Sequence, residues 1–231
     1  MLNNRLRKLF AGAGLILLLA AAPAWAGVVY NVTLNTGALP AGSYSLLFQL
    51  TDGSGTNDGN NIVTLSNFAY GGGGAVAGPQ LWGGASGDLT SGVTLTDNDF
   101  FNAIVQGFTR GSQLSYTLDL TTNVDSGGPP DLFAMSVLDA NGNEIPTADS
   151  SGANTLLTIT FDSPLGIQTF PTDPNRATST GAFITMGAPV LTPVTESSVP
   201  EPSSWLLLGT SLAWLIGRQR PNTRRSRTCT E

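Results

Sequence analysis

The chain has 231 residues, with 16 acidic and ten basic side chains, one cysteine and no histidine. It therefore lacks the usual general base and metal ligand, and a single cysteine forms no internal disulfide. Between Gly27 and Pro202 there are 15 acidic residues and only two arginines, so this stretch carries a formal charge of −13. A surface this negative repels nucleic acid and anionic lipid, which excludes both as expected partners.

Residues 1–26 have the three parts of a secretory signal peptide. A short apolar run follows a basic start that contains Arg5, Arg7 and Lys8. The small residues Ala24 and Ala26 flank a tryptophan and predict cleavage before Gly27. We therefore expect an N-terminal signal helix that the secretion machinery and a signal peptidase recognise, with an uncleaved anchor or a buried helix as the alternative.

Residues 27–188 are predicted to form one all-β domain. Apolar side chains recur at every second position in short runs that Gly, Asn, Asp and Pro separate, which is typical of strands with one buried face. The predicted strands are Val28–Asn35, Tyr44–Thr51, Ile62–Tyr70, Gly92–Thr96, Ala103–Phe108, Gln113–Thr121, Leu132–Leu138, Thr155–Phe161 and Phe183–Met186. This pattern predicts an antiparallel β-sandwich that is jelly-roll-like.

Two acidic loops are candidates for a calcium site, because Ca²⁺ takes several oxygen ligands. The first loop contains Asp52 and Asp58. The second matches only the start of a calcium-binding loop, since Glu144 stands where glycine is needed, and its candidate ligands are Asp139, Asn141 and Asn143. Turn formation is the alternative for both loops, because Asp and Asn favour turns. No other cofactor or metal is expected.

Three aromatic residues are candidates for contact with carbohydrate. Trp82 stands among glycines, and Phe100 and Phe101 are adjacent, so on a strand one of the two faces away from the core. Such side chains could form a platform for sugar rings. The alternative is that they pack in the core or at a sheet edge.

No catalytic residues are predicted. Asp97 and Asp99 could act as a carboxylate pair in glycoside hydrolysis, but neighbouring acids of this kind are normally solvated loop residues. The chain has no G-x-S-x-G motif and no glycine-rich phosphate loop before a helix. We therefore expect a protein that is not an enzyme.

The C-terminal part consists of segments in a fixed order. Residues 189–198 are predicted to be a linker, and residues 199–202 form a Val-Pro-Glu-Pro motif. An apolar run at 203–217 follows, and the basic end at 218–231 contains Arg218, Arg220, Arg224, Arg225 and Arg227. As a helix, 15 residues cover about 22 Å, less than the bilayer core of about 30 Å. We therefore expect a short hydrophobic helix that holds the tail in the inner membrane transiently, with an ordinary single-span anchor as the alternative.

This order resembles the PEP-CTERM proteins of Gram-negative bacteria. The resemblance implies that an exosortase recognises Pro200, Glu201 and Pro202, that Trp205–Gly217 enters the inner membrane, and that the arginines stay cytoplasmic. The basic cluster is more spread out than in that class. Stretches between about Tyr44 and Asp162 also resemble a group of PEP-CTERM proteins with no assigned activity.

These features together predict an exported protein of the cell envelope or extracellular matrix, without catalytic activity, that an exosortase sorts and processes at its C-terminus. The alternative is a carbohydrate-binding module, assisted by Ca²⁺, that associates with exopolysaccharide. Both interpretations place the β domain at the cell surface or in the matrix of a Gram-negative bacterium.

Overall fold

The computed structural model describes residues 27–125 and 127–194. The signal peptide with Ala24 and Ala26, and the sorting tail with Pro200, Glu201, Pro202 and the arginines at 218–227, lie outside the described residues. Within the described residues, no helix is both long and apolar enough to cross a membrane.

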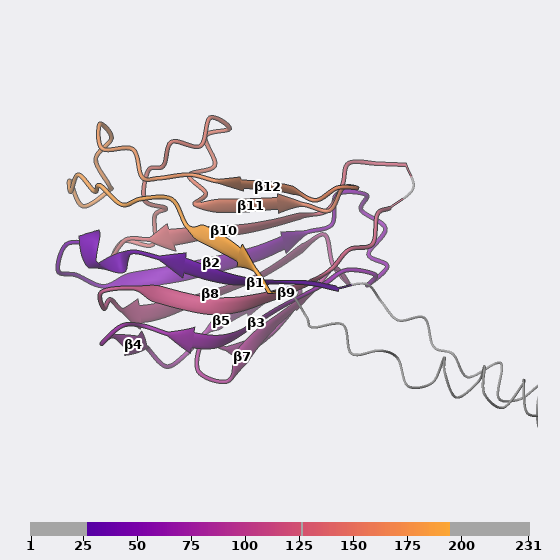
Figure 1. Ribbon diagram of the computed structural model, residues 1–231, viewed down its shortest axis with the longest axis horizontal. Helices are drawn as coiled ribbons and strands as arrows, with labels where there is room; N and C mark the ends of the chain where they lie inside the picture. The colour runs from indigo at the N-terminus through magenta and orange to yellow at the C-terminus, as the bar shows by residue number, and fades with distance from the viewer. Residues whose placement is uncertain (1–26, 126, 195–231) are drawn as a thin grey trace, which may run out of the picture. The chain divides into compact units, whose positions relative to one another are not determined.

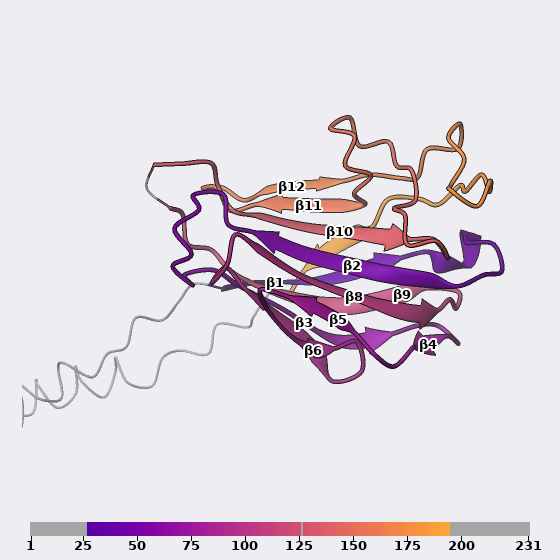
Figure 2. The same cartoon turned by 180° about the vertical axis from the view of Figure 1, so that it is seen from behind.

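Two antiparallel sheets form the described chain, and its only helix is one 3-10 turn, η1 (Thr36–Ala38). Sheet A has the order β13-β1-β9-β3-β7-β6, with bounds Val190–Pro193, Gly27–Leu34, Leu114–Thr121, Ile62–Ala69, Gly92–Thr96 and Gly84–Asp88. Sheet B has the order β12-β11-β10-β2-β8-β4, with bounds Gly166–Thr169, Leu157–Thr160, Leu132–Leu138, Tyr44–Thr51, Phe101–Thr109 and Gly74–Ala75. The remaining strand, β5 (Gln80–Trp82), also pairs with β8. Figures 1 and 2 show the sheets from opposite sides.

The core lies between the two sheets. Phe48 of sheet B is fully buried, and its ring meets that of Tyr116 of sheet A edge-on, with centroids 5.5 Å apart. The Tyr116 hydroxyl donates to Met135 Sδ across the sheets at 3.3 Å. Alternate residues of the central strands are buried in the same way, which confirms an all-β, two-sheet fold and is consistent with the predicted β-sandwich.

Eight of the nine predicted strands are present, with ends that shift by up to two residues. The ninth, Phe183–Met186, is wrong, because only an isolated bridge joins Phe183 to Ala177 there. The sequence interpretation missed five short strands, all outside the centre of the sheets: β4, β5, β6, β12 and β13. Short or exposed strands carry little alternation, so the pattern that found the central strands does not reveal them.

The linker predicted at 189–198 is wrong for its first half, because β13 pairs with β1 there. Leu191 lies opposite Val32 and packs against the core, and Pro193 lies opposite Tyr30. Proline suggested a linker, but an edge strand tolerates proline because one side of it makes no ladder hydrogen bonds.

The loops gather at two ends of the sheets. At one of these ends, strands β2, β7 and β9 finish and strands β3, β8 and β10 begin. We call it the acidic end, because it carries Asp52, Asp97, Asp125 and Asp131. In Figure 1 the loop after β2 and the loop before β10 lie together at the right, and the hairpin after β10 lies at the left. Strand β1 begins and β13 finishes at the acidic end, since Gly27 is opposite Thr121 and Pro193 is opposite Tyr30.

Candidate functional site

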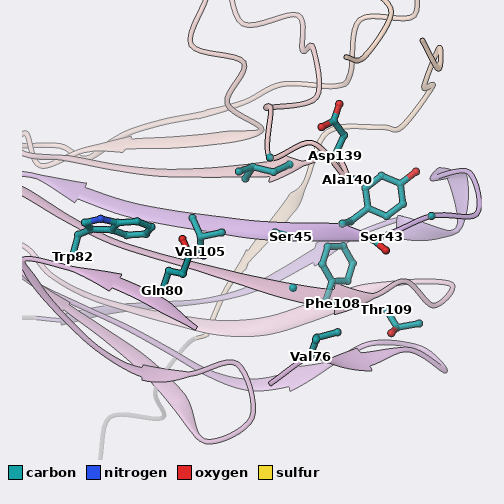
Figure 3. A pocket seen from close by; sticks show the side chains of 15 residues that line it. Ser43, Ser45, Val76, Gln80, Trp82, Val105, Phe108, Thr109, Asp139 and Ala140 are labelled. Carbon is teal, nitrogen blue, oxygen red and sulfur yellow. The ribbon is translucent and has the colours of Figure 1, made fainter. Parts of the chain in front are cut away.

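An open pocket of about 560 Å³ lies over β2 and β8 of sheet B. Ser45, Val105 and Gly107 line it, and they alternate with core-facing residues of the same strands. Figure 3 shows Trp82 at one end of the pocket with Gln80 beside it, and Asp139 near the other end. The pocket therefore combines an aromatic ring with several polar groups on the outward face of sheet B.

Trp82 is held at this pocket by its strand and by the glycines that follow it. It lies opposite Ala103 of β8, so its side chain shares the outward face, and 43% of it is exposed. Gly83 has φ +57, and a Cβ at this position would collide with the carbonyl oxygen of Phe101. Gly84 then donates its backbone N–H to Oδ1 of the buried Asn102 at 2.7 Å. The two glycines after Trp82 thus allow the chain to turn tightly between β5 and β6, with the indole ring on the outward face of sheet B.

The two phenylalanine candidates have different positions. Phe101 lies two residues before Ala103 on β8, so it shares the outward face with Trp82 as a diagonal neighbour, and it is 43% exposed. Phe100 precedes the strand and is 62% exposed, while its carbonyl accepts from the Asp52 N–H. The structure therefore brings together Trp82 and Phe101, and neither phenylalanine lines the pocket itself.

Asp139 lines the pocket and anchors the hairpin that follows β10. Its Oδ1 accepts the backbone N–H groups of Asn141 and Asn143 at 3.0 and 3.2 Å, and its Oδ2 accepts from the Ser179 hydroxyl and N–H at 2.6 and 3.1 Å. Burial raises the pKa of Asp139, but these donors outweigh it and hold the pKa below its ordinary value. The loop with the second set of predicted calcium ligands therefore forms a hydrogen-bonded turn in the structure. The side-chain amide of Asn141 donates a hydrogen bond to the Ser179 hydroxyl.

A second cluster lies at the acidic end, where the carboxylates of Asp52, Asp125 and Asp131 have oxygen atoms within 4.8 Å of one another. Asp52 is buried, and its carboxylate accepts from the Gly55 and Asn57 N–H groups. Burial raises the pKa of Asp52, but these donors and Ser54 lower it overall. Asp58, the other predicted ligand, is exposed and accepts from Asn60.

Asp97 extends this cluster into the protein. It is fully buried, and its Oδ2 accepts the Asn61 N–H at 3.0 Å. Burial raises the pKa of Asp97 to about 7; the Asn61 N–H opposes this rise, and the neighbouring Asp131 carboxyl adds to it. Asp99 is exposed. The structure thus separates the two acids that could have formed a hydrolase pair, because one is in the core and the other in solvent.

Sequence reasoning missed Asp125 and Asp131 of this cluster, and Gln80 of the pocket. These acids are far from Asp52 in the sequence, and only the strand order brings them together. One signal existed: Asp52, Asp97 and Asp131 each directly follow or precede a predicted strand, so they lie at strand ends. Gln80 gave no signal, because β5 was not recognised as a strand.

Comparison with known proteins leaves the chain without a match: no protein-family model, no curated protein and no solved structure is similar to it.

Proposed function

We propose that this chain is a non-catalytic, exported surface protein that binds a neutral polysaccharide in the pocket beside Trp82. One observation carries this proposal: Trp82 leaves 43% of its surface in water at the rim of a pocket lined by hydroxyl, amide and carboxylate groups. Ligand sites combine apolar side chains with a few fixed polar groups in this way.

The chemistry of a sugar ring suits this arrangement. Its C–H groups form an apolar face that can stack on the indole, with Gln80 beside it for the hydroxyls, while the next sugars of a chain can reach Ser45 and Asp139 farther along the pocket. Phe101 extends the aromatic surface along β8 beyond the pocket, as a chain of several sugars needs. The ligand is neutral in this proposal, because the surrounding domain is strongly acidic and repels anionic polymers.

The strand order supports a jelly roll as the finer fold. The chain passes between the sheets after β1, β2, β3, β5, β7, β8, β9 and β12, and these crossings include the orders β1-β9-β3-β7 in sheet A and β2-β8-β4 in sheet B. Repeated crossing of this kind is how a jelly roll wraps two sheets around one core. The remaining strands extend the sheet edges.

The location of the protein is also part of the proposal. The signal sequence before Gly27 supports export, and the Pro-Glu-Pro motif, apolar run and arginines support sorting by an exosortase at the inner membrane. The protein would then remain at the cell surface or enter the extracellular matrix. A surface protein that binds other proteins instead of sugar is the alternative.

The test is binding of the purified full chain, kept in mild detergent, to a panel of neutral glucans and mannans and to an acidic uronate polymer. We expect saturable binding to a neutral polymer. Trp82→Ala should raise the Kd by roughly thirtyfold, since a buried aromatic contact at a binding site contributes about 2 kcal/mol or more.

Phe183→Ala is the matched control, because Phe183 is also a large exposed side chain, at 65%, and does not line the pocket. It should bind as the unchanged protein does. Flat binding curves across the panel, or equal losses for the two variants, would overturn the polysaccharide proposal and leave protein partners as the alternative to pursue by crosslinking on whole cells.

A further inference from the structure

We propose that the acidic end holds a Ca²⁺ ion between the carboxylates of Asp52, Asp125 and Asp131, with Asp97 and Asn60 completing the protein ligands. The first three offer one oxygen each within 4.8 Å of one another. They come from the loop after β2 and the loop before β10, which the strand order places side by side (Figure 2).

Two unsatisfied oxygen atoms are the independent evidence for a ligand. Among the described residues, only Asp97 Oδ1 and Asn60 Oδ1 are buried side-chain atoms without a hydrogen-bond partner. Asp97 is 0% exposed, and buried polar atoms are satisfied in the great majority of cases. Asn60 is hydrogen-bonded to Asp125 and Asp97 is joined to Asp131 through Asn61, so both atoms lie in the network around this one cluster, which indicates that something outside the chain satisfies them.

Hydrogen bonds connect both residues, through their other polar atoms, to the carboxylates of the cluster. Asn61 donates its N–H to Asp97 Oδ2 and its side-chain amide to Asp131 Oδ2, so it holds the two acids together. Asn60 donates its amide to Asp125 Oδ1, which leaves its own carbonyl oxygen at the cluster without a donor. A buried oxygen that lacks a donor, on a side chain tied into a group of carboxylates, is suited to coordinate a cation.

The charges around the cluster also favour a bound cation. The two arginines of the described residues are engaged elsewhere: Arg110 donates to the Pro40 carbonyl and Arg176 to Asn154. The cluster thus gathers several carboxyl groups with no basic side chain hydrogen-bonded to it within the described part of the chain. A single proton between Asp97 and Asp131 would neutralise only one of them, whereas a divalent ion neutralises two.

The ligand set favours Ca²⁺ over Mg²⁺. It consists of oxygen atoms alone, from carboxylates and an amide on loops, and Ca²⁺ accepts six to eight such ligands in irregular geometry. Mg²⁺ requires near-ideal octahedral geometry and retains most of its water. The ion would connect loops of sheet B, after β2 and before β10, with Asp97 after β7 of sheet A.

The first experiment follows thermal unfolding of the full chain in chelator, in about 10 mM Ca²⁺ and in about 10 mM Mg²⁺. Extracellular calcium sites have Kd values of about 0.1 to 1 mM, so Ca²⁺ should raise Tm by about 3 to 10 °C. Mg²⁺ should raise it much less. Equal shifts with both ions, or no shift with Ca²⁺, would overturn the proposal, and the second result would instead favour a proton shared by Asp97 and Asp131.

Asp125→Asn separates a binding site from a merely structural cluster. Asp125 is only partly buried, and the variant removes one negative charge, so its Tm in chelator should equal or exceed that of the unchanged chain. Its Ca²⁺-dependent shift should be lost. Asp149→Asn, a buried acid outside the cluster, should keep the full Ca²⁺ shift whatever its starting Tm. A Ca²⁺ shift that survives in Asp125→Asn would contradict the site.

Discussion

Buried carboxylates fall into two kinds in this molecule, according to the donors around them. Asp149 is 8% exposed and accepts from the Ser151 N–H and the Thr155 hydroxyl. Burial raises its pKa, but these donors lower it overall. Asp97 has one donor and a carboxyl neighbour, and burial raises its pKa to about 7. A carboxylate of the first kind stabilises the fold by itself, whereas one of the second kind needs a further partner.

Asp149→Asn should therefore lower the free energy of unfolding at neutral pH and make that free energy depend less on pH. The amide retains one acceptor oxygen instead of two, which costs about 1 to 3 kcal/mol. Because the folded pKa of Asp149 lies below its ordinary value of 3.8, its contribution is present above that pH and is lost as the pH falls through the folded pKa.

Chemical unfolding of both proteins between neutral pH and about pH 3 measures this effect, with the exposed Asp162→Asn as control. The curve of Asp149→Asn should approach that of the unchanged protein toward the acid end. Parallel curves over the whole range would show that Asp149 contributes no pH-dependent stability.

At the level of elements, sequence alternation revealed the central strands and failed at the edges. Tyr44–Thr51 and Leu132–Leu138 were predicted with the bounds that they have, because each places one face in the core. Strand β5 has three exposed residues and therefore no buried face to give a pattern. The segment Phe183–Met186 has buried residues that alternate, but its neighbours are loops, so burial there does not mean a strand.

The edge strand β13 provides a test at this scale. A chain that ends at Pro189 should be less stable than one that ends at Val194, because it loses the four pairs between β13 and β1. Cross-strand pairs contribute about 0.2 to 1 kcal/mol each, so the loss should be about 1 to 4 kcal/mol. Thermal unfolding measures it, and size-exclusion chromatography should show more self-association from the uncovered edge of β1. Equal stability of the two chains would show that residues 190–193 do not stabilise the sheet and act as a linker.

At the level of the whole molecule, the strand order determines which residues meet. The sequence identified Trp82, Phe101 and Asp52 as candidates, but the pocket requires β5 beside β8, and the acidic cluster requires the loops after β2 and before β10 to meet. These contacts join segments that are distant in sequence. Local patterns therefore predicted the class of fold and some members of each site, whereas the assembled sites follow only from the topology.

Sorting by an exosortase would involve the signal sequence and the C-terminal tail as well as the β domain, so it is tested on the whole chain. Replacing Pro200, Glu201 and Pro202 by alanine should block removal of the tail, because the proposed recognition motif is lost. Export should stay intact, because the signal sequence, the apolar run and the arginines are unchanged. Mass spectrometry of the envelope fraction should find the unprocessed tail. The matched control replaces Thr195, Glu196 and Ser197 by alanine and should be processed normally, and normal processing of the motif variant would refute recognition by an exosortase.

The position of β13 also has a mechanical consequence. This strand finishes beside the first residues of β1, so a force on Val194 that points away from the opposite end of the sheets acts along the strand. Such a load shears the four pairs between β13 and β1 together, whereas a load at a right angle would open them one after another. If the protein is tethered by its C-terminal side while the pocket binds a polymer, a load along β13 therefore stresses this edge in the direction in which it resists most.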